Sequence, residues 1–174
     1  MWICVCLLIS TACISYAAGQ NDDGAFTSAV LPKKNNNNQL EFAGQKYYFN
    51  TVFKANYFGA MAYCKQQGME LLSIESQAEN KRIELFLVEN GLTYGHFWTS
   101  ATKSVDNVHW KWLSTGRDIV YTNWYWSEPN NIPIVWEHCI EIRIEGTTGL
   151  TWNDLPCSRE LLSICEAPKN YCRC

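Results

Sequence analysis

Oxygen-bearing side chains are concentrated in three short stretches in the second half of the chain. The first is Glu128-Pro129-Asn130, the second is Glu137, two residues before Cys139, and the third is Trp152-Asn153-Asp154, three residues before Cys157. Calcium is a hard cation that takes about six to eight oxygens from carboxylates, amide carbonyls and water. The set contains no thiol or imidazole, which disfavours zinc and copper. We therefore predict one calcium site whose ligands are Glu128, Asn130, Glu137, Asn153 and Asp154.

Two helices are predicted in the first half of the chain. Residues 56–67 carry a helical signal that ends at Gly68, and its inward-facing candidates are Phe58, Ala62 and Cys64. The second helix begins at a capping box, in which Ser76 is followed three residues later by Glu79, and it ends at Gly91. The apolar stripe of this second helix consists of Ile83, Phe86 and Leu87.

The second half of the chain is predicted to form strands and one long loop. Runs rich in β-branched or aromatic residues indicate strands at residues 97–99, 109–113, 139–144 and 161–166, after an earlier one at 46–49. The stretch between Leu113 and Glu137 is a loop, and a compact domain rarely carries so long a loop without a use for it. The fold class is therefore α+β, with two helices followed by an antiparallel sheet and an elaborated loop.

The composition is that of a small secreted protein. The chain has 174 residues, 47% of them hydrophobic, with 9 Cys, 8 Trp and a formal charge of −3. This charge argues against binding to nucleic acid or anionic lipid by bulk electrostatics. Residues 1–18 are apolar, uncharged and end in small residues, so we predict a signal peptide and no membrane span in the mature protein. A flexible polar leader (19–41), one domain (42–167) and a short Cys-x-Cys tail (168–174) then follow.

Signal cleavage leaves an even set of cysteines in an oxidising compartment. They are Cys64, Cys139, Cys157, Cys165, Cys172 and Cys174. Sequence alone allows about 15 pairings of six cysteines. Cys172 and Cys174 lie beyond the domain, and a Cys-x-Cys bridge within one chain is geometrically tight. One interpretation is a disulfide-linked homodimer through either cysteine; the other is a local bridge or pairing with small thiols.

The three oxygen-rich stretches resemble the mannose-type carbohydrate-recognition domain of the C-type lectin family. The resemblance covers about residues 42–167 and depends on Glu128-Pro129-Asn130, Trp152-Asn153-Asp154, the cysteine spacing, and Trp98 and Trp124 in the expected order. Phe97-Trp98-Thr99-Ser100 together with Ser114-Thr115-Gly116-Arg117 is similar to secreted arthropod lectins.

The resemblance implies several features of the site. It pairs Cys64 with Cys165 and Cys139 with Cys157, and it implies a cis peptide bond at Glu128-Pro129. The second disulfide would close a short loop and hold Glu137 close to Asn153 and Asp154, a constraint that contributes about 3 kcal/mol in the chain-entropy model. In the family, a Glu-Pro-Asn order goes with equatorial 3- and 4-hydroxyls, as in mannose, and a Gln-Pro-Asp order goes with galactose.

Sugar binding at such a site follows from donors and acceptors. Each of two neighbouring hydroxyls would give a lone pair to calcium, donate its proton to Glu128 or Glu137, and accept a hydrogen bond from Asn130 or Asn153. Many relatives hold a second calcium ion, but here its places are taken by other residues, and we predict no full second site. Those residues are Lys103, Asn107, Asn131 and His138.

The tryptophans divide into two groups. Trp98, Trp124 and Trp152 are expected in the core, whereas Trp126 and Trp136 flank the ligand loop. Each of these two either stacks on a sugar face or packs within the loop. Strand alternation places the side chain of His138 away from the ion.

The leading hypothesis is a secreted, calcium-dependent lectin that recognises mannose-type glycans on microbes or cells, as in innate immunity. The alternative is a calcium-stabilised, lectin-like module that binds a protein rather than sugar. An enzyme is disfavoured because the available acids are committed to metal and no nucleophile arrangement stands out.

Overall fold

The computed structural model describes residues 38–131 and 136–169. The predicted signal peptide (1–18), most of the leader, and Cys172 and Cys174 lie outside these ranges. Within the described ranges, no helix has the length and apolar character needed to cross a membrane.

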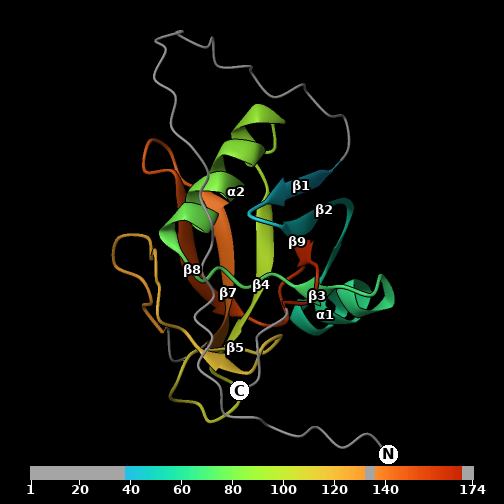
Figure 1. The fold of residues 1–174 in the computed structure, drawn as a ribbon. Coiled ribbons are helices and arrows are strands. Elements are labelled where there is room, and N and C mark those ends of the chain that lie inside the picture. Colours follow the sequence, from blue (N-terminus) through green and yellow to red (C-terminus); the bar gives the residue numbers. More distant parts are fainter. Residues whose placement is uncertain (1–37, 132–135, 170–174) are drawn as a thin grey trace, which may run out of the picture. The chain divides into compact units, whose positions relative to one another are not determined.

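The chain forms two helices and a sheet, as the sequence predicted (Figure 1). The helices are α1 (Tyr57–Gln66) and α2 (Gln77–Glu89). The strands are β1 (Gln39–Phe42), β2 (Gln45–Ala55), β3 (Glu70–Leu71), β4 (His96–Thr102), β5 (Lys111–Trp112), β6 (Arg117–Asp118), β7 (Glu137–Ile144), β8 (Leu150–Pro156) and β9 (Leu161–Glu166).

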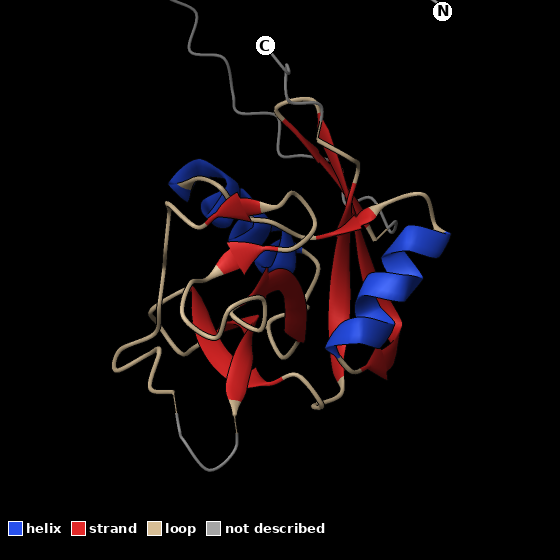
Figure 2. Cartoon of the chain, turned by 90° about the horizontal axis from the view of Figure 1, so that it is seen from below, coloured by secondary structure: helices blue, strands red, loops and turns tan. Residues whose placement is uncertain are grey.

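The described strands pair into one mainly antiparallel sheet. Its main path runs β1-β2-β9-β4-β5-β6, and the β4–β9 pair is parallel. A branch leaves this path at β4, where β7 pairs with β4 on one side and with β8 on the other. Helix α1 packs against β3 and β9, and α2 packs against β8 and β1, with strands between the two helices (Figure 2).

Helix α1 buries a different face from the one predicted. Asn56 caps it by accepting a hydrogen bond from the Gly59 amide at 2.9 Å. Cys64 is buried as predicted, but Phe58 is 61% exposed and Ala62 is also exposed. The buried positions are Tyr57, Ala60 and Cys64. The disulfide from Cys64 to β9 fixes this face toward the sheet, so tertiary structure overrides the size of Phe58.

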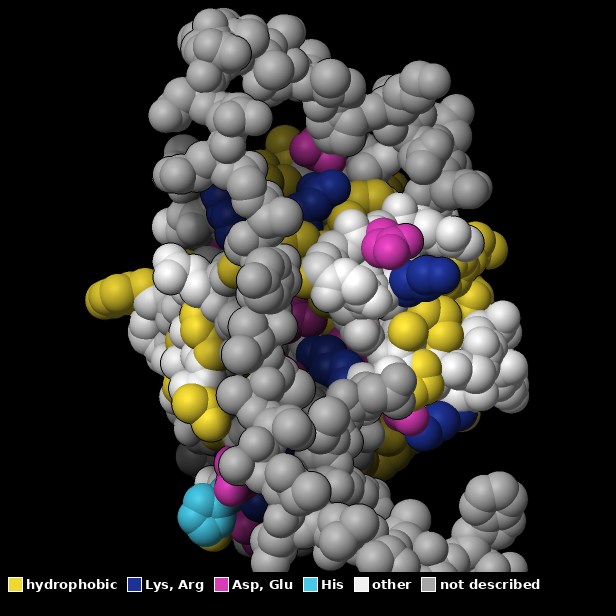
Figure 3. All heavy atoms as spheres, viewed as in Figure 1, with side chains coloured by type: hydrophobic (Ala, Val, Ile, Leu, Met, Phe, Trp, Pro, Cys, Tyr) yellow, Lys and Arg dark blue, Asp and Glu magenta, His cyan; other side chains and the backbone are white. Residues whose placement is uncertain are grey.

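Apolar side chains on the α1 side of the molecule are also exposed. Val52 and Phe53 in β2 are 81% and 42% exposed. The ring of Phe53 contacts that of Tyr63 edge-on, at a centroid distance of 4.9 Å. Figure 3 shows hydrophobic side chains at the surface in the region of α1.

Helix α2 confirms its prediction in detail. The Ser76 side chain accepts a hydrogen bond from the Glu79 amide at 3.2 Å. The Glu79 carboxylate in turn accepts from the backbone amide of Glu75 at 2.8 Å, one residue before the position that a capping box predicts. The predicted stripe is buried, and Phe86 stacks on Phe49 of β2 at 4.3 Å.

The predicted strands are present, but four of the nine described strands were not predicted, namely β1, β8 and the two-residue strands β3 and β6. Strand β8 was not predicted, because its centre carries the polar pair Asn153 and Asp154 and does not show a clean apolar alternation. Strand β1 begins at Gln39, within the range assigned to the flexible leader, and pairs Gln39 with Tyr48 of β2. A single buried residue in β1, Leu40, gave too little apolar signal to predict it.

Both disulfides implied by the family resemblance are present. Cys64–Cys165 joins α1 to β9 across 101 residues, and Cys139–Cys157 joins the start of β7 to the turn after β8. The second bond therefore links the two strands, β7 and β8, that carry Glu137, Asn153 and Asp154.

A buried charge cluster attaches residue 169 to the domain. Lys169 Nζ lies 3.2 Å from a carboxylate oxygen of Glu166, 3.3 Å from one of Glu79, and 2.7 Å from the carbonyl oxygen of Ser73. Burial raises the pKa of Glu166 to about 7, although Lys169 and Ser73 oppose the shift. These contacts connect the end of β9 to the beginning of α2.

The different burial of two phenylalanines gives a matched stability test. Phe86→Ala removes a ring that is 5% exposed and stacked in the core, so it should lower the free energy of unfolding by about 3–5 kcal/mol. Phe58→Ala should change it by less than about 1 kcal/mol, because most of this ring is already in water. Urea unfolding measures both, and equal losses would contradict the α1 assignment.

The pKa of Glu166 predicts an unusual pH dependence. A carboxyl group whose pKa is raised by folding binds its proton more tightly in the native state, so stability falls as pH rises from 4.5 to about 7. The shift corresponds to about 3 kcal/mol over this range. Glu166→Gln should remove this slope from the pH profile of unfolding, whereas the exposed control Glu160→Gln should retain it. Parallel profiles for the wild type and Glu166→Gln would refute the assignment.

Candidate calcium and sugar site

The long loop is held against β8 by backbone hydrogen bonds and by aromatic packing. The Trp152 amide donates to the Asn123 carbonyl at 2.9 Å, and the Tyr125 amide donates to the Trp152 carbonyl at 2.8 Å. The rings of Trp124 and Trp152 lie 5.9 Å apart. Trp98 and Trp152 are fully buried and Trp124 packs against the core, as predicted. These contacts fix the position of the loop just before the predicted ligands Glu128 and Asn130.

Three of the five predicted ligands are brought together where this loop passes β8. The Glu128-Pro129 peptide bond is cis, as the resemblance implied. The Asn130 amide lies within hydrogen-bond distance of Glu128 Oε2 at 3.0 Å and of Asp154 Oδ1 at 3.2 Å. The Asn131 amide donates to the second Asp154 oxygen at 3.1 Å. One backbone N–H thus faces two carboxylates from different parts of the chain.

The proximity of these two carboxylates is electrostatically unfavourable without a cation. Burial raises the pKa of Glu128, and the neighbouring Asp154 raises it further, while the Asn130 amide opposes the shift. Two carboxylates with adjacent amide oxygens form the kind of donor set that a hard divalent cation stabilises. The residues present therefore fit calcium.

Glu137 and Asp154 both interact electrostatically with a buried lysine. Glu137 is 6% exposed at the start of β7, and Lys103 is 8% exposed just after β4. Burial lowers the pKa of Lys103, whereas the charges of Asp154 and Glu137 both act to raise it. Its ammonium also lies 5.0 Å from the centre of the Trp110 ring. From the sequence, Lys103 stands at a position that many relatives use for a second calcium ion. The sequence did not predict that Lys103 is a buried cation beside two predicted ligands.

The side chain of Asn153 is hydrogen-bonded to Glu141, a residue that the sequence did not indicate as part of the site. Asn153 is 6% exposed, and its Nδ2 donates to Glu141 Oε1 at 3.0 Å. Glu141 is 1% exposed and pairs with Asn153 across β7 and β8. No sequence motif marks Glu141; only the register of the two strands reveals the contact.

The five predicted ligands do not form one closed acidic cluster. In residues 38–131 and 136–169, no three acidic, histidine or cysteine side chains are grouped closely enough to hold a metal ion. Glu128 and Asp154 converge on the Asn130 amide, whereas Glu137 lies at the start of β7 and the side chain of Asn153 is hydrogen-bonded to Glu141. The complete ligand set remains a prediction.

Two tryptophans beside the loop are largely in water. Trp126 is 84% exposed and Trp136 is 71% exposed, so neither is packed within the loop. His138 contacts Trp136 edge-on at 5.7 Å, and both Lys103 and Asp154 affect its pKa, which burial lowers. A β-bulge between Glu137 and Cys139 interrupts the alternation that was expected to turn His138 away from the ion.

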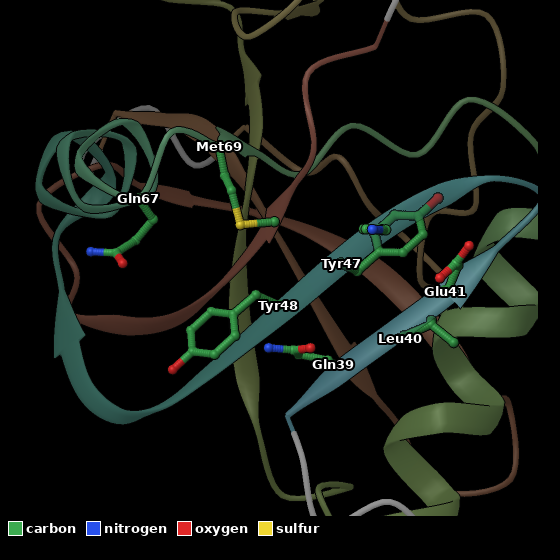
Figure 4. Close-up of a pocket in the computed structure, with 8 residues that line it drawn as sticks. Gln39, Leu40, Glu41, Tyr47, Tyr48, Gln67 and Met69 are labelled. Carbon is green, nitrogen blue, oxygen red and sulfur yellow. The ribbon is translucent and has the colours of Figure 1, made fainter.

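A hollow of about 580 Å³ lies elsewhere, along β1 and β2 beside the end of α1 (Figure 4). Its lining includes Gln39, Tyr48, Gln67 and Met69, and none of the predicted calcium ligands. The candidate sugar site is a surface formed by the loop and β8 rather than this hollow.

The chain belongs to the C-type lectin family, because the family model for the lectin C-type domain matches residues 53–167. Salivary C-type lectin 2 of Aedes albopictus is 30% identical over 122 residues, which are 66% of this chain and 79% of that protein. C-type lectin domains are non-enzymatic binding domains that generally bind calcium, and this chain is therefore a binding protein rather than an enzyme.

Solved structures share the fold. The C-type lectin domain of murine dendritic cell inhibitory receptor 2, solved in complex with N-glycan, superposes with a TM-score of 0.64 at 28% identity, covering 76% of this chain and 97% of that chain. A calcium-independent type II antifreeze protein superposes with a TM-score of 0.61 at 23% identity over 74% of this chain and 90% of its own. The second similarity shows the fold alone.

The two hydrogen bonds that Asp154 accepts predict how the metal-free loop behaves. Asp154→Ala removes the charged acceptor of the Asn130 and Asn131 amides, and such a bond contributes about 1.5–3 kcal/mol. Hydrogen exchange at these two amides, measured with EDTA present, should therefore accelerate at least about tenfold. The control Thr151→Ala, on the same strand, should leave both rates unchanged. Equal rates in Asp154→Ala and wild type would show that Asp154 does not order the loop.

Proposed function

We propose that this chain is a secreted, calcium-dependent lectin that binds sugars with adjacent equatorial hydroxyls, such as mannose. The convergence of Glu128 and Asp154 on the Asn130 amide carries the proposal, because it brings the Glu128-Pro129-Asn130 segment of the loop next to β8, the strand with two of the predicted ligands. The Glu128-Pro129-Asn130 order supports the mannose type.

The side chains of the site supply both the metal ligands and the contacts to sugar. Glu128, Asn130, Glu137, Asn153 and Asp154 would hold one calcium ion, which contributes Lewis-acid binding of two vicinal hydroxyl oxygens. Glu128 and Glu137 would accept hydrogen bonds from these hydroxyls, and the amides of Asn130 and Asn153 would donate to the hydroxyl oxygens. Trp126 and Trp136 are exposed enough to stack on the apolar face of a bound sugar.

A single calcium ion suits the charges around the site. The places of a second ion hold Lys103, Asn107, Asn131 and His138. The buried ammonium of Lys103 already supplies a positive charge beside Asp154 and Glu137, and a second divalent cation there would be repelled.

Secretion agrees with the disulfides and with the relative from Aedes albopictus. Cys64–Cys165 and Cys139–Cys157 are stable in an oxidising compartment. The signal peptide (1–18) and a disulfide-linked homodimer through Cys172 or Cys174 remain part of this proposal. Recognition of glycans on microbes or cells would then benefit from avidity.

A calcium-stabilised module that binds protein is the second candidate. The exposed Trp126 and Trp136 are also suited to a protein interface, where aromatic side chains dominate the binding energy. A module of this kind would gain thermal stability from calcium and would retain no glycan.

A glycan array with calcium and with EDTA tests the proposal. The wild type should bind mannose-type glycans only with calcium, and Asp154→Ala should lose this binding, because a central ligand is removed. Glu128→Gln combined with Asn130→Asp should shift preference toward galactose by reversing the acid–amide order. The control Glu160→Gln lies outside the site and should bind as wild type. Calcium-dependent thermal stabilisation without any glycan signal would favour the protein-binding module instead.

A further inference from the structure

The carboxylate of Glu141 is buried and contacts the predicted ligand Asn153. Glu141 is 1% exposed at the centre of β7 and receives hydrogen bonds from two neighbouring strands. His96 Nδ1 of β4 lies 2.8 Å from its Oε2. Arg143 Nη1 and Asn153 Nδ2 lie 3.2 and 3.0 Å from its Oε1. The carboxylate is thus fixed in place from three sides.

The chemistry of this contact determines which end of the Asn153 amide faces Glu141. An ionised carboxylate only accepts hydrogen bonds, and an asparagine side chain carries a donating NH2 group and an accepting oxygen. The NH2 group must therefore face Glu141, because the opposite orientation would place two acceptors against each other in a buried site.

The sheet then determines where the amide oxygen points. Strand β7, which carries Glu141, lies on one side of β8. The loop lies on the other side, where Tyr125 bonds to Trp152 and the Asn130 amide to Asp154. Since the two polar atoms of an amide diverge, an NH2 group held toward β7 leaves the oxygen facing the loop.

We infer that Glu141 is a positioning residue, which orients the Asn153 side chain so that its oxygen is presented to the calcium ion and one N–H remains for a sugar hydroxyl. This inference rests on the proposed function for the identity of the ion. Residues that hydrogen-bond to metal ligands typically contribute about 10–100-fold to metal affinity.

Glu141→Gln tests the inference in the full chain. The substituted glutamine has one acceptor oxygen for three donors, and its own NH2 group favours rotation of Asn153, which turns the amide oxygen away from the loop. Calcium titration by calorimetry, without sugar, should show affinity at least about tenfold weaker than wild type. Glu145→Gln is the matched control, because Glu145 also pairs with Arg143 but does not bond Asn153.

A double-mutant cycle separates positioning from general stability. If Glu141 acts through Asn153, Glu141→Gln should have no further effect on calcium affinity in an Asn153→Ala background. An undiminished loss in that background, or wild-type affinity in Glu141→Gln alone, overturns the inference. The melting temperature in EDTA reports any purely structural cost separately.

A measurement on the metal-free wild type tests the orientation even if no variant folds. The Asn153 side-chain NH2 protons should exchange with solvent at least about tenfold more slowly in NMR than those of the exposed Asn107. Equal rates overturn the inference. If exchange is slow but the wild type binds no calcium, the hydrogen bond between Asn153 and Glu141 is confirmed. The proposed function is then wrong, and so is the role of Glu141 in metal binding.

Discussion

Two hydrogen bonds accepted by one aspartate define the site, since Asp154 connects a regular strand to an irregular loop. The loop contains a cis proline and has left-handed backbone conformations at Ser127 and Asn131. The carboxylate of Asp154 satisfies two of its amides and brings Glu128 into the same small volume. Every other feature of the site depends on keeping β8 in register with that loop.

The fold secures this register by several independent means. Strand β8 is paired with β7 along its length, is bonded to the loop at Asn123 and Tyr125, and is followed by a disulfide to β7. The tryptophan cluster around Trp152 fills the core beneath it. The cost of burying acids is offset locally, by Lys103 beside Asp154 and by Arg143 and His96 beside Glu141.

The sequence predicted the fold class, α2, most of the strands, both disulfides and the cis proline, because each has a local signature or belongs to the family pattern. The exposed face of α1 was mispredicted, since an apolar Phe58 outweighed the smaller Ala60 when only residue type was considered. Strand β8 was missed for a related reason, because the polar residues Asn153 and Asp154 interrupt its apolar alternation. Glu141 and the buried state of Lys103 required strand register and tertiary packing, which no local pattern encodes.

The candidate site consists of a buried half and a solvent-exposed half. Asn153 and Asp154 are almost inaccessible to solvent, whereas Asn130 is exposed and Glu128 is partly so. Substitutions on the outer half leave the hydrophobic interior intact and so carry little risk of unfolding. Ligand preference in such a scaffold can therefore diversify during evolution almost independently of the constraints that preserve the folded chain.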